Sequence, residues 1–258
     1  MAMALTFVTP RWNASRNVRA LCTTRAGGVS AGSWASLNLG THVGDVPAAV
    51  EQNRRLLQVA AELPSEPQWL RQMHGVEVAD LDALPAGSIP EADAALTTRA
   101  GTVCAVLTAD CLPVVFAATD GSLVGVAHAG WRGLAAGVLE AAVAAMRSRL
   151  APGVELIHWI GPAISAGHFE VGVDVRDAFL STGPQDEAAF SIGRPARWQC
   201  DLPRLARRRL ASLGVADGGG GDHCTYEEEA MFYSHRRDVQ HRGLATTGRM
   251  ATLVWRQA

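Results

Sequence analysis

The chain has 258 residues, of which 48% are hydrophobic, and a formal net charge of −2 at pH 7. This is enough apolar sequence for a sizeable core, and the mixing of acidic and basic residues along the chain predicts no nucleic-acid partner. No apolar run approaches the roughly 20 residues that span a bilayer, so no membrane partner is predicted. Five widely spaced cysteines favour reduced thiols over a disulfide framework.

Three helices are predicted from apolar spacing and end signals. The first covers residues 45–63 with Asp45 as its N-cap, and the second covers the alanine-rich residues 133–150. The third covers residues 201–214, starting at Asp201 and ending at Gly214. The beginning, MAMALTFVTPRW, has no charged leader followed by an apolar stretch, so we expect a cytoplasmic protein.

Strands are predicted where short apolar runs lie between turn signals. They are TVCAVLT (102–108), PVVFAAT (113–119), SLVGVAH (122–128), VELIHWIG (154–161) and ATLVWR (251–256). The glycine-rich ADGGGGD (216–222) predicts a loop tip. Because helices and strands do not alternate strictly, we expect an α/β or α+β fold with mixed sheets flanked by outer helices, in one domain over residues 1–258.

Polar residues interrupt two neighbouring strands, in LTADCLPVV (107–115) and VAHAGWRGL (126–134). If the Asp-Gly pair at 120–121 forms the connecting turn, the numbers of paired residues sum to 241, so His128 faces Pro113. Cys111 and His128 are then diagonal neighbours on one face, about 7–8 Å apart between Cα atoms. Pro113 lacks an N–H, so the strand is expected to be an edge or to bulge there.

A thiolate and an imidazole are good zinc ligands, and a catalytic zinc usually has three protein ligands and one open position. His74 in QMHGVEV (72–78) is the best third candidate, because it precedes a glycine and a likely strand, so that a histidine again lies at a break in the pattern. A single buried cysteine is more often part of the core, and a single histidine at a strand end is more often structural. Their shared face, with Asp110, Trp131 and Arg132 beside them, favours a site.

Ten short motifs resemble the YfiH-type family, also called the laccase-domain or multicopper polyphenol oxidase-like family. They are TTRAGGVS (23–30), SLNLGTHVGD (36–45), QMHG (72–75), EADAALT (91–97), TADCLPV (108–114), HAGWRG (128–133), IGPAIS (160–165), FEVG (169–172), FYSHRRD (232–238) and TGRM (247–250). Their presence together and in order makes the resemblance specific. One departure is His235, where the family usually carries tyrosine.

The resemblance implies one zinc ion held by His74, Cys111 and His128, the same trio that spacing indicates. It implies an α/β-class fold of mixed sheets with outer helices, similar to that of bacterial toxin-type cysteine hydrolases. The implied activities are phosphorolysis of adenosine, inosine or methylthioadenosine, and deamination of adenosine. The implied partners are therefore a purine nucleoside and phosphate.

These activities point to further candidate residues. Zinc lowers the pKa of bound water to about 7, and deamination also needs an acid that protonates the leaving ammonia, for which Asp110 and Asp93 are candidates. Asn38 is a candidate for contact with the base or ribose, and Trp131 for stacking on the purine. Guanidinium groups suit phosphate, and those in the motifs are Arg25, Arg132, Arg236, Arg237 and Arg249.

Three other interpretations stay open. In a cysteine hydrolase, such as an amidase that edits cell-wall precursors, Cys111 would be the nucleophile and His128 its base. A multicopper oxidase would need His-X-His pairs, and none of the eight histidines has that spacing. A binding module with structural zinc would need a fourth ligand, for which Cys224 is conceivable. Ser30 in GVSAG (28–32) fits a nucleophile elbow, but no apolar helix follows it.

Overall fold

The computed structural model describes residues 4–85 and 87–257, whose strands form three sheets. The strands are β1 (Phe7–Val8), β2 (Val18–Thr23), β3 (Val78–Asp80), β4 (Ala94–Thr97), β5 (Cys104–Thr108), β6 (Leu112–Ala118), β7 (Val124–Ala129), β8 (Leu156–Ile160), β9 (Glu170–Val171), β10 (Phe190–Ile192), β11 (Trp198–Cys200), β12 (Ala216–Gly220) and β13 (Met250–Arg256). The sheet orders are β12–β8–β6–β7–β4–β3, β1–β2–β13–β5 and β10–β11–β9. The five strands expected from the sequence all form.

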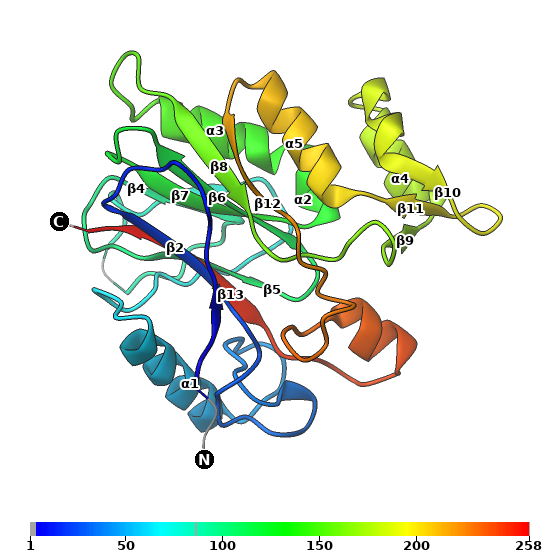
Figure 1. Ribbon diagram of the computed structural model, residues 1–258, viewed down its shortest axis with the longest axis horizontal. Helices are drawn as coiled ribbons and strands as arrows, with labels where there is room; N and C mark the ends of the chain where they lie inside the picture. The colour runs from blue at the N-terminus through cyan, green and yellow to red at the C-terminus, as the bar shows by residue number, and fades with distance from the viewer. Residues whose placement is uncertain (1–3, 86, 258) are drawn as a thin grey trace.

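Helices cover the outer faces of the two larger sheets, with α3 and α5 on one side of the molecule and α1 on the other (Figure 1). The α-helices are α1 (Pro47–Ala60), α2 (Trp131–Ala136), α3 (Val138–Arg147), α4 (Val173–Leu180) and α5 (Leu202–Ser212). The other helical segments are η1 (Gly32–Trp34), η2 (Pro184–Ala189) and η3 (Arg236–His241). Within the described residues, no helix combines the length and apolar character needed to cross a bilayer. The mixed-sheet architecture with outer helices is as predicted.

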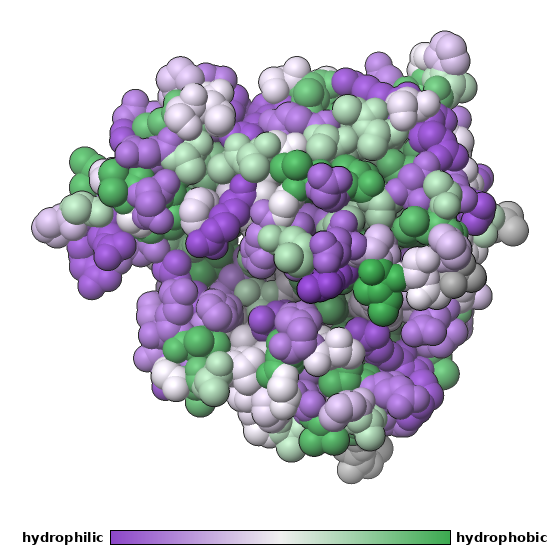
Figure 2. All heavy atoms as spheres, turned by 180° about the vertical axis from the view of Figure 1, so that it is seen from behind, coloured by the Kyte–Doolittle hydropathy of each residue, from purple (hydrophilic) through white to green (hydrophobic). Residues whose placement is uncertain are grey.

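Strand β6 shows how the sheets pack, because its side chains alternate between two buried clusters. Val114 and Phe116 belong to the cluster beneath α3 and α5, whereas Val115 and Ala117 belong to the cluster between the two larger sheets. A strand that is buried on both faces has a continuous apolar sequence, which explains the uninterrupted run in β6. The face of the molecule opposite to that of Figure 1 carries interspersed hydrophobic and hydrophilic side chains (Figure 2).

The predicted hairpin register is confirmed. Leu112 pairs with Ala129 and Pro113 pairs with His128, and Gly121 in the connecting turn has a φ of 74°. The expectation that Pro113 marks an edge or a bulge is wrong, because β6 lies between β7 and β8 with no register shift. The pairing with β8 begins only at Val114, so the proline lies at the end of the sheet, where its missing N–H is tolerated.

Two predicted elements differ from the structure because of glycine. The helix expected over residues 133–150 is divided into α2 and α3 at Gly137, whose φ of 102° ends the first helix. The loop tip expected at 216–222 is instead largely β12, which runs parallel to β8. A Cβ on Gly218 would lie 2.5 Å from the carbonyl oxygen of His158. Glycine is therefore needed here for close approach between strands.

The helix starts give one correct and one incorrect prediction. The Asp201 side chain accepts the N–H of Arg204 at 2.9 Å, as an N-cap residue should. Asp45 does not cap α1, whose N-cap residue is Val46. The Asp45 carboxylate instead accepts a hydrogen bond from Ser30 at 2.6 Å, which places Ser30 in a buried loop network.

Candidate metal centre

Three elements bring the predicted trio together. His74 lies in a turn before β3, Cys111 immediately precedes β6, and His128 lies in β7. Their candidate ligand atoms all lie within 4.8 Å of one another, and Cys111 Sγ is 3.9 Å from His74 Nε2. Zinc binds sulfur at about 2.3 Å and nitrogen at about 2.0 Å, so ligand atoms around a tetrahedral ion lie roughly 3–4 Å apart. The donor set and its spacing fit one divalent ion, and we call this trio the metal centre.

A single buried carboxylate, that of Asp93, positions two of the three side chains. It accepts the backbone N–H groups of Met73, His74 and Gly75 at 3.0, 3.0 and 2.7 Å, and it bonds His128 Nδ1 at 2.8 Å. These bonds stabilise a turn in which His74 has a left-handed φ of 59°. A carboxylate behind a histidine also fixes the orientation of its ring for metal binding.

The environment of Asp93 favours an orienting role over proton donation. Burial by itself raises the pKa of the Asp93 carboxyl, but hydrogen bonds from His128 and Gly75 outweigh it and hold the pKa below its ordinary value. The group is therefore ionised at neutral pH and has no proton to give to a leaving group.

Without a metal, Cys111 and His128 form an ion pair. Burial raises the pKa of the Cys111 thiol, but the positive charge of His128 and hydrogen bonds from His128 and His74 outweigh it and lower that pKa to about 6. Burial lowers the pKa of His128, but Cys111 and Asp93 raise it to about 9. At pH 7 the sulfur is thus a thiolate, the form that binds metal.

Gly130 provides the space in which the three side chains meet. A Cβ at this position would lie 2.9 Å from His74 Cδ2, 3.1 Å from Cys111 Sγ and 3.4 Å from His128 Cε1. The φ of Gly130 is −58°, which any residue can adopt. Glycine is therefore needed at position 130 because a side chain would not fit, and not because the backbone conformation demands it.

We expect Gly130→Ala to separate the ligands by a few tenths of an ångström, and to lower metal affinity about tenfold or more while the protein stays folded. The measurement is competition for zinc with a chromophoric chelator, with thermal unfolding followed in parallel. Gly167→Ala is the matched control, because a Cβ there meets only Ser165 Oγ at 3.9 Å. Unchanged affinity in Gly130→Ala would contradict this role for the glycine.

The metal centre lies in the wall of a cavity of about 690 Å³, which is within the range of small-molecule sites. Of the other residues that the sequence indicates, Asp110, Trp131, Arg132, Arg236 and Arg249 also line it. His42, Phe169 and Gln240 line the same cavity, although the sequence did not indicate them as site residues. His42 and Phe169 lie within motifs, but nothing in the local sequence shows which motif residues face inward.

Two cavity arginines are held by backbone carbonyls. Arg236 Nη1 donates to the carbonyl of Glu170 at 2.8 Å, and its guanidinium lies over the ring of Phe169, 5.2 Å from the ring centre. Arg249 Nη1 donates to the carbonyl of Thr247 at 2.8 Å. Burial lowers the pKa of both guanidinium groups below the ordinary value, but arginine stays charged at neutral pH. Arg132 is exposed and stacks on Trp131.

Two predicted substrate contacts, Arg25 and Asn38, lie outside the residues that line the cavity. Arg25 donates from Nε to the carbonyl of Ala35 at 3.0 Å, and its guanidinium lies over the Tyr233 ring. Asn38 is fully buried, and its Oδ1 accepts the N–H of Arg249 at 2.9 Å. The structure therefore gives both side chains a role in holding loops.

Asp110 lines the cavity but uses both carboxylate oxygens in hydrogen bonds. Oδ1 accepts from Thr225 Oγ1 at 2.7 Å, and Oδ2 accepts from Ser234 Oγ at 3.0 Å and from the N–H of Arg236 at 2.6 Å. Because Asp110 precedes Cys111, these bonds fix the metal centre to the segment that carries Arg236. The contacts favour positioning over proton donation.

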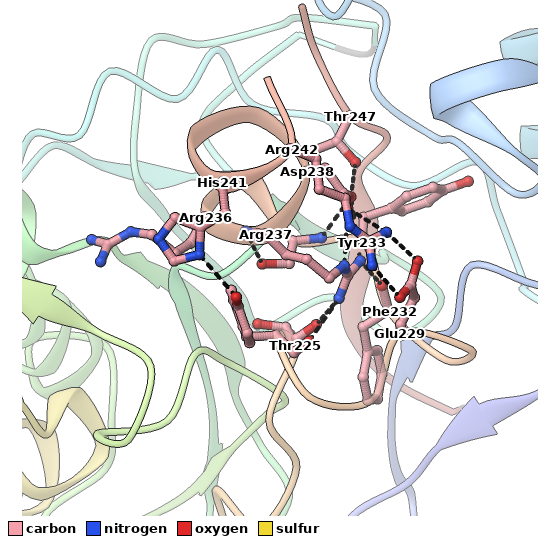
Figure 3. A network of polar contacts seen from close by, with 12 residues as sticks. Thr225, Glu229, Phe232, Tyr233, Arg236, Arg237, Asp238, His241, Arg242 and Thr247 are labelled. Atoms are coloured by element: carbon pink, nitrogen blue, oxygen red, sulfur yellow. Dashed lines mark hydrogen bonds and ion pairs between the residues drawn. The ribbon is translucent and has the colours of Figure 1, made fainter. Parts of the chain in front are cut away.

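Arg237 belongs to a buried network and is not among the cavity residues (Figure 3). Its Nη1 donates to the carbonyl of Thr225 at 2.8 Å, and its Nη2 donates to that of Phe232 at 2.9 Å. Its Nε pairs with Asp238 at 2.9 Å, and Asp238 also accepts from Thr247 Oγ1 at 2.7 Å. The network connects η3 with the two loops on either side of it, and these loops carry the cavity residues His235 and Arg249.

The fold and the site define a known class of protein. The family model described as multi-copper polyphenol oxidoreductase laccase matches residues 19–257, and the chain belongs to this laccase-domain family, of the YfiH type. It is 47% identical over 248 residues to purine nucleoside phosphorylase YfiH of Escherichia coli K12, covering 96% of this chain and 98% of that protein. A Pseudomonas aeruginosa purine nucleoside phosphorylase is 47% identical over 252 residues, covering 97% of this chain and 98% of that protein.

Solved structures agree with this assignment. A Neisseria meningitidis protein of the DUF152 family has a TM-score of 0.88 to this chain at 47% identity, covering 98% of this chain and 99% of that one. YlmD from Geobacillus stearothermophilus has a TM-score of 0.83 at 34% identity, covering 94% of this chain and 93% of that one. The family resemblance seen in the sequence motifs is thus confirmed.

Proposed function

We propose that the protein is a zinc-dependent purine nucleoside phosphorylase that acts on adenosine, inosine and methylthioadenosine, with an additional adenosine deaminase activity. The observation that carries the proposal is that one cavity combines the metal centre with Arg132, Arg236 and Arg249. The names of the relatives in Escherichia coli and Pseudomonas aeruginosa support the same reaction. His74, Cys111 and His128 would hold the ion.

In phosphorolysis, a phosphate oxygen forms a bond to ribose C1′ while the bond from C1′ to the purine nitrogen breaks. The products are the free purine and ribose 1-phosphate, or methylthioribose 1-phosphate when methylthioadenosine is the substrate. The purine nitrogen takes up the proton that the attacking phosphate loses. The three cavity arginines would bind phosphate and hold it against the sugar, since planar guanidinium groups bind its oxygens in pairs. Trp131 and Phe169 would pack against the purine ring. A zinc ion bound at the trio would supply Lewis acidity.

Two cavity histidines suit recognition of the nucleoside. Burial and the positive charge of Arg249 lower the pKa of both His42 and His235. Both rings are therefore neutral at pH 7, and each offers one donor and one acceptor nitrogen. His235 lies where the family usually has tyrosine, and a neutral imidazole can replace its hydroxyl as a hydrogen-bonding group.

The direct test is a substrate screen with product chromatography. The purified protein is incubated with adenosine, inosine or methylthioadenosine, with and without phosphate. Release of free base together with ribose 1-phosphate, or methylthioribose 1-phosphate from methylthioadenosine, only when phosphate is present supports phosphorolysis. Phosphate-independent conversion of adenosine to inosine supports deamination. Absence of phosphate-dependent base release with all three nucleosides would refute the phosphorylase proposal.

Arg132→Ala is expected to raise the KM for phosphate about tenfold, equivalent to ~1.4 kcal/mol, with little change in stability because the side chain is exposed. The loss of a positive charge at the cavity entrance weakens anion binding. Steady-state kinetics at varied phosphate and fixed inosine measure the effect. Arg55→Ala, which removes an exposed arginine that pairs with Glu51 on α1, should leave the KM unchanged.

A cysteine hydrolase is the second candidate, because Cys111, His128 and Asp93 are arranged as nucleophile, base and orienting carboxylate. Iodoacetamide distinguishes the two. In the phosphorylase, bound zinc protects Cys111 in the protein as purified, and chelation makes it react at pH 7, because its pKa is lowered to about 6. Rapid alkylation of Cys111 before chelation would favour the hydrolase.

A further inference from the structure

We infer that His168, Cys224 and Glu227 form a second site for a divalent metal ion, separate from the metal centre. Their candidate ligand atoms, a nitrogen, a sulfur and a carboxylate oxygen, all lie within 4.8 Å of one another. None of the three lines the cavity. Zinc accepts all three ligand types, and the trio joins two segments that are more than fifty residues apart in the sequence.

The His168 ring is held in one orientation without a bound ion. Its Nε2 lies 2.8 Å from Glu227 Oε1, and its ring stacks on that of Tyr226, with centres 4.3 Å apart and planes 14° from parallel. The Tyr226 hydroxyl is in turn bonded to His241 Nδ1 at 2.8 Å. A cation would replace the hydrogen bond between His168 and Glu227, and both side chains would keep their positions as metal ligands.

The sulfur is equally constrained. Cys224 is 5% exposed, and its Sγ accepts the backbone N–H of Ser165 at 3.4 Å. Its own N–H donates to Glu228 Oε1 at 2.8 Å. The buried thiol thus lies beside the other two candidate metal ligands, His168 and Glu227. The Glu227 side chain is 63% exposed. An ion can therefore enter from the solvent side, where water would complete its coordination.

An ion at this second site would stabilise the segments that form one side of the cavity. His168 is followed by Phe169, which lines the cavity. Cys224 is followed by Thr225, whose hydroxyl donates to Asp110 beside Cys111. The ion would therefore join the segment that carries the cavity residue Phe169 to the segment that holds Asp110, next to the metal ligand Cys111. This placement indicates a structural ion that stabilises the catalytic cavity.

The test uses the full-length variant His74→Ala/Cys111→Ser, which lacks the metal centre, so the result does not depend on the proposed function. After treatment with chelator and dialysis, the protein is titrated with Co²⁺ while near-ultraviolet absorption is recorded. We expect one equivalent to bind with the charge-transfer band of a thiolate ligand. No stoichiometric binding, or binding without that band, would overturn the inference.

Further substitutions in that background assign the ligands. Cys224→Ser should remove the charge-transfer band, and His168→Ala, a change at a partly exposed side chain, should weaken Co²⁺ binding at least tenfold. His223→Ala is the matched control, because this neighbouring histidine pairs with Glu228 and is not part of the trio. Equal binding in His168→Ala and His223→Ala would contradict the second site. Circular dichroism of each variant establishes that it is folded.

Discussion

Cys111→Ser is expected to remove one equivalent of metal and to lower kcat/KM for inosine phosphorolysis about 10³-fold, equivalent to ~4 kcal/mol of transition-state stabilisation. The thiolate is the only anionic member of the metal centre, and a serine hydroxyl does not ionise in its place. The fold should survive, because Cys111 lies at the cavity surface, against two histidines that reach it from separate elements. Elemental analysis and steady-state kinetics on the same sample measure both losses.

The control for this substitution is Cys200→Ala, which removes a fully buried thiol outside the cavity-lining residues. It should retain metal and activity. His74→Ala should reproduce the Cys111→Ser result, since a centre with two ligands holds zinc poorly. Full activity in a Cys111→Ser protein that has lost this equivalent of metal would contradict the metal-dependent mechanism. Copper in place of zinc, together with phenol oxidation, would favour the oxidase interpretation.

Arg237→Met is expected to lower the free energy of unfolding by about 3–5 kcal/mol. The substitution removes the buried cation that contacts the Asp238 carboxylate at 2.9 Å and leaves only the half-exposed Arg242 at 3.9 Å. It also removes the donors to the carbonyls of Thr225 and Phe232. Urea unfolding followed by fluorescence and circular dichroism measures the change. Because the network holds loops around the cavity, activity should decline together with stability.

Arg242→Ala is the matched comparison for this prediction. Arg242 follows η3, pairs with Glu229 at the surface and lies 3.9 Å from Asp238, but its side chain is 49% exposed. Exposed ion pairs contribute about 0–1 kcal/mol, so its removal should change stability by less than about 1 kcal/mol. Similar losses in Arg237→Met and Arg242→Ala would show that burial of Arg237 has no special energetic weight.

Much of the site geometry could be predicted from local sequence. The Asp-Gly turn at 120–121 predicts the correct register between β6 and β7, because turn chemistry fixes the pairing of a hairpin. That register alone is sufficient to place Cys111 near His128. His74 could be added as a candidate because it precedes a glycine and a likely strand, and its positive φ shows that the chain does turn there.

Long-range partners explain what the sequence did not reveal. In the sequence, Gly218 resembles a loop residue. In the structure it lies beside β8, and the strands can pair only because Gly218 has no side chain. Arg237 and Arg236 are adjacent in one motif, but only Arg236 reaches the cavity. Arg236 donates to the carbonyl of Glu170 and Arg237 donates to the carbonyl of Thr225, and the motif contains no information about either partner.

The dual attachment of Asp93 ties the two imidazoles to a common anchor. One is held through the peptide groups of its turn and the other through its ring nitrogen, so neither can retreat without disturbing the other. A substitution that displaces the turn carrying His74 is therefore expected to displace the His128 ring as well, even though the two residues belong to separate elements.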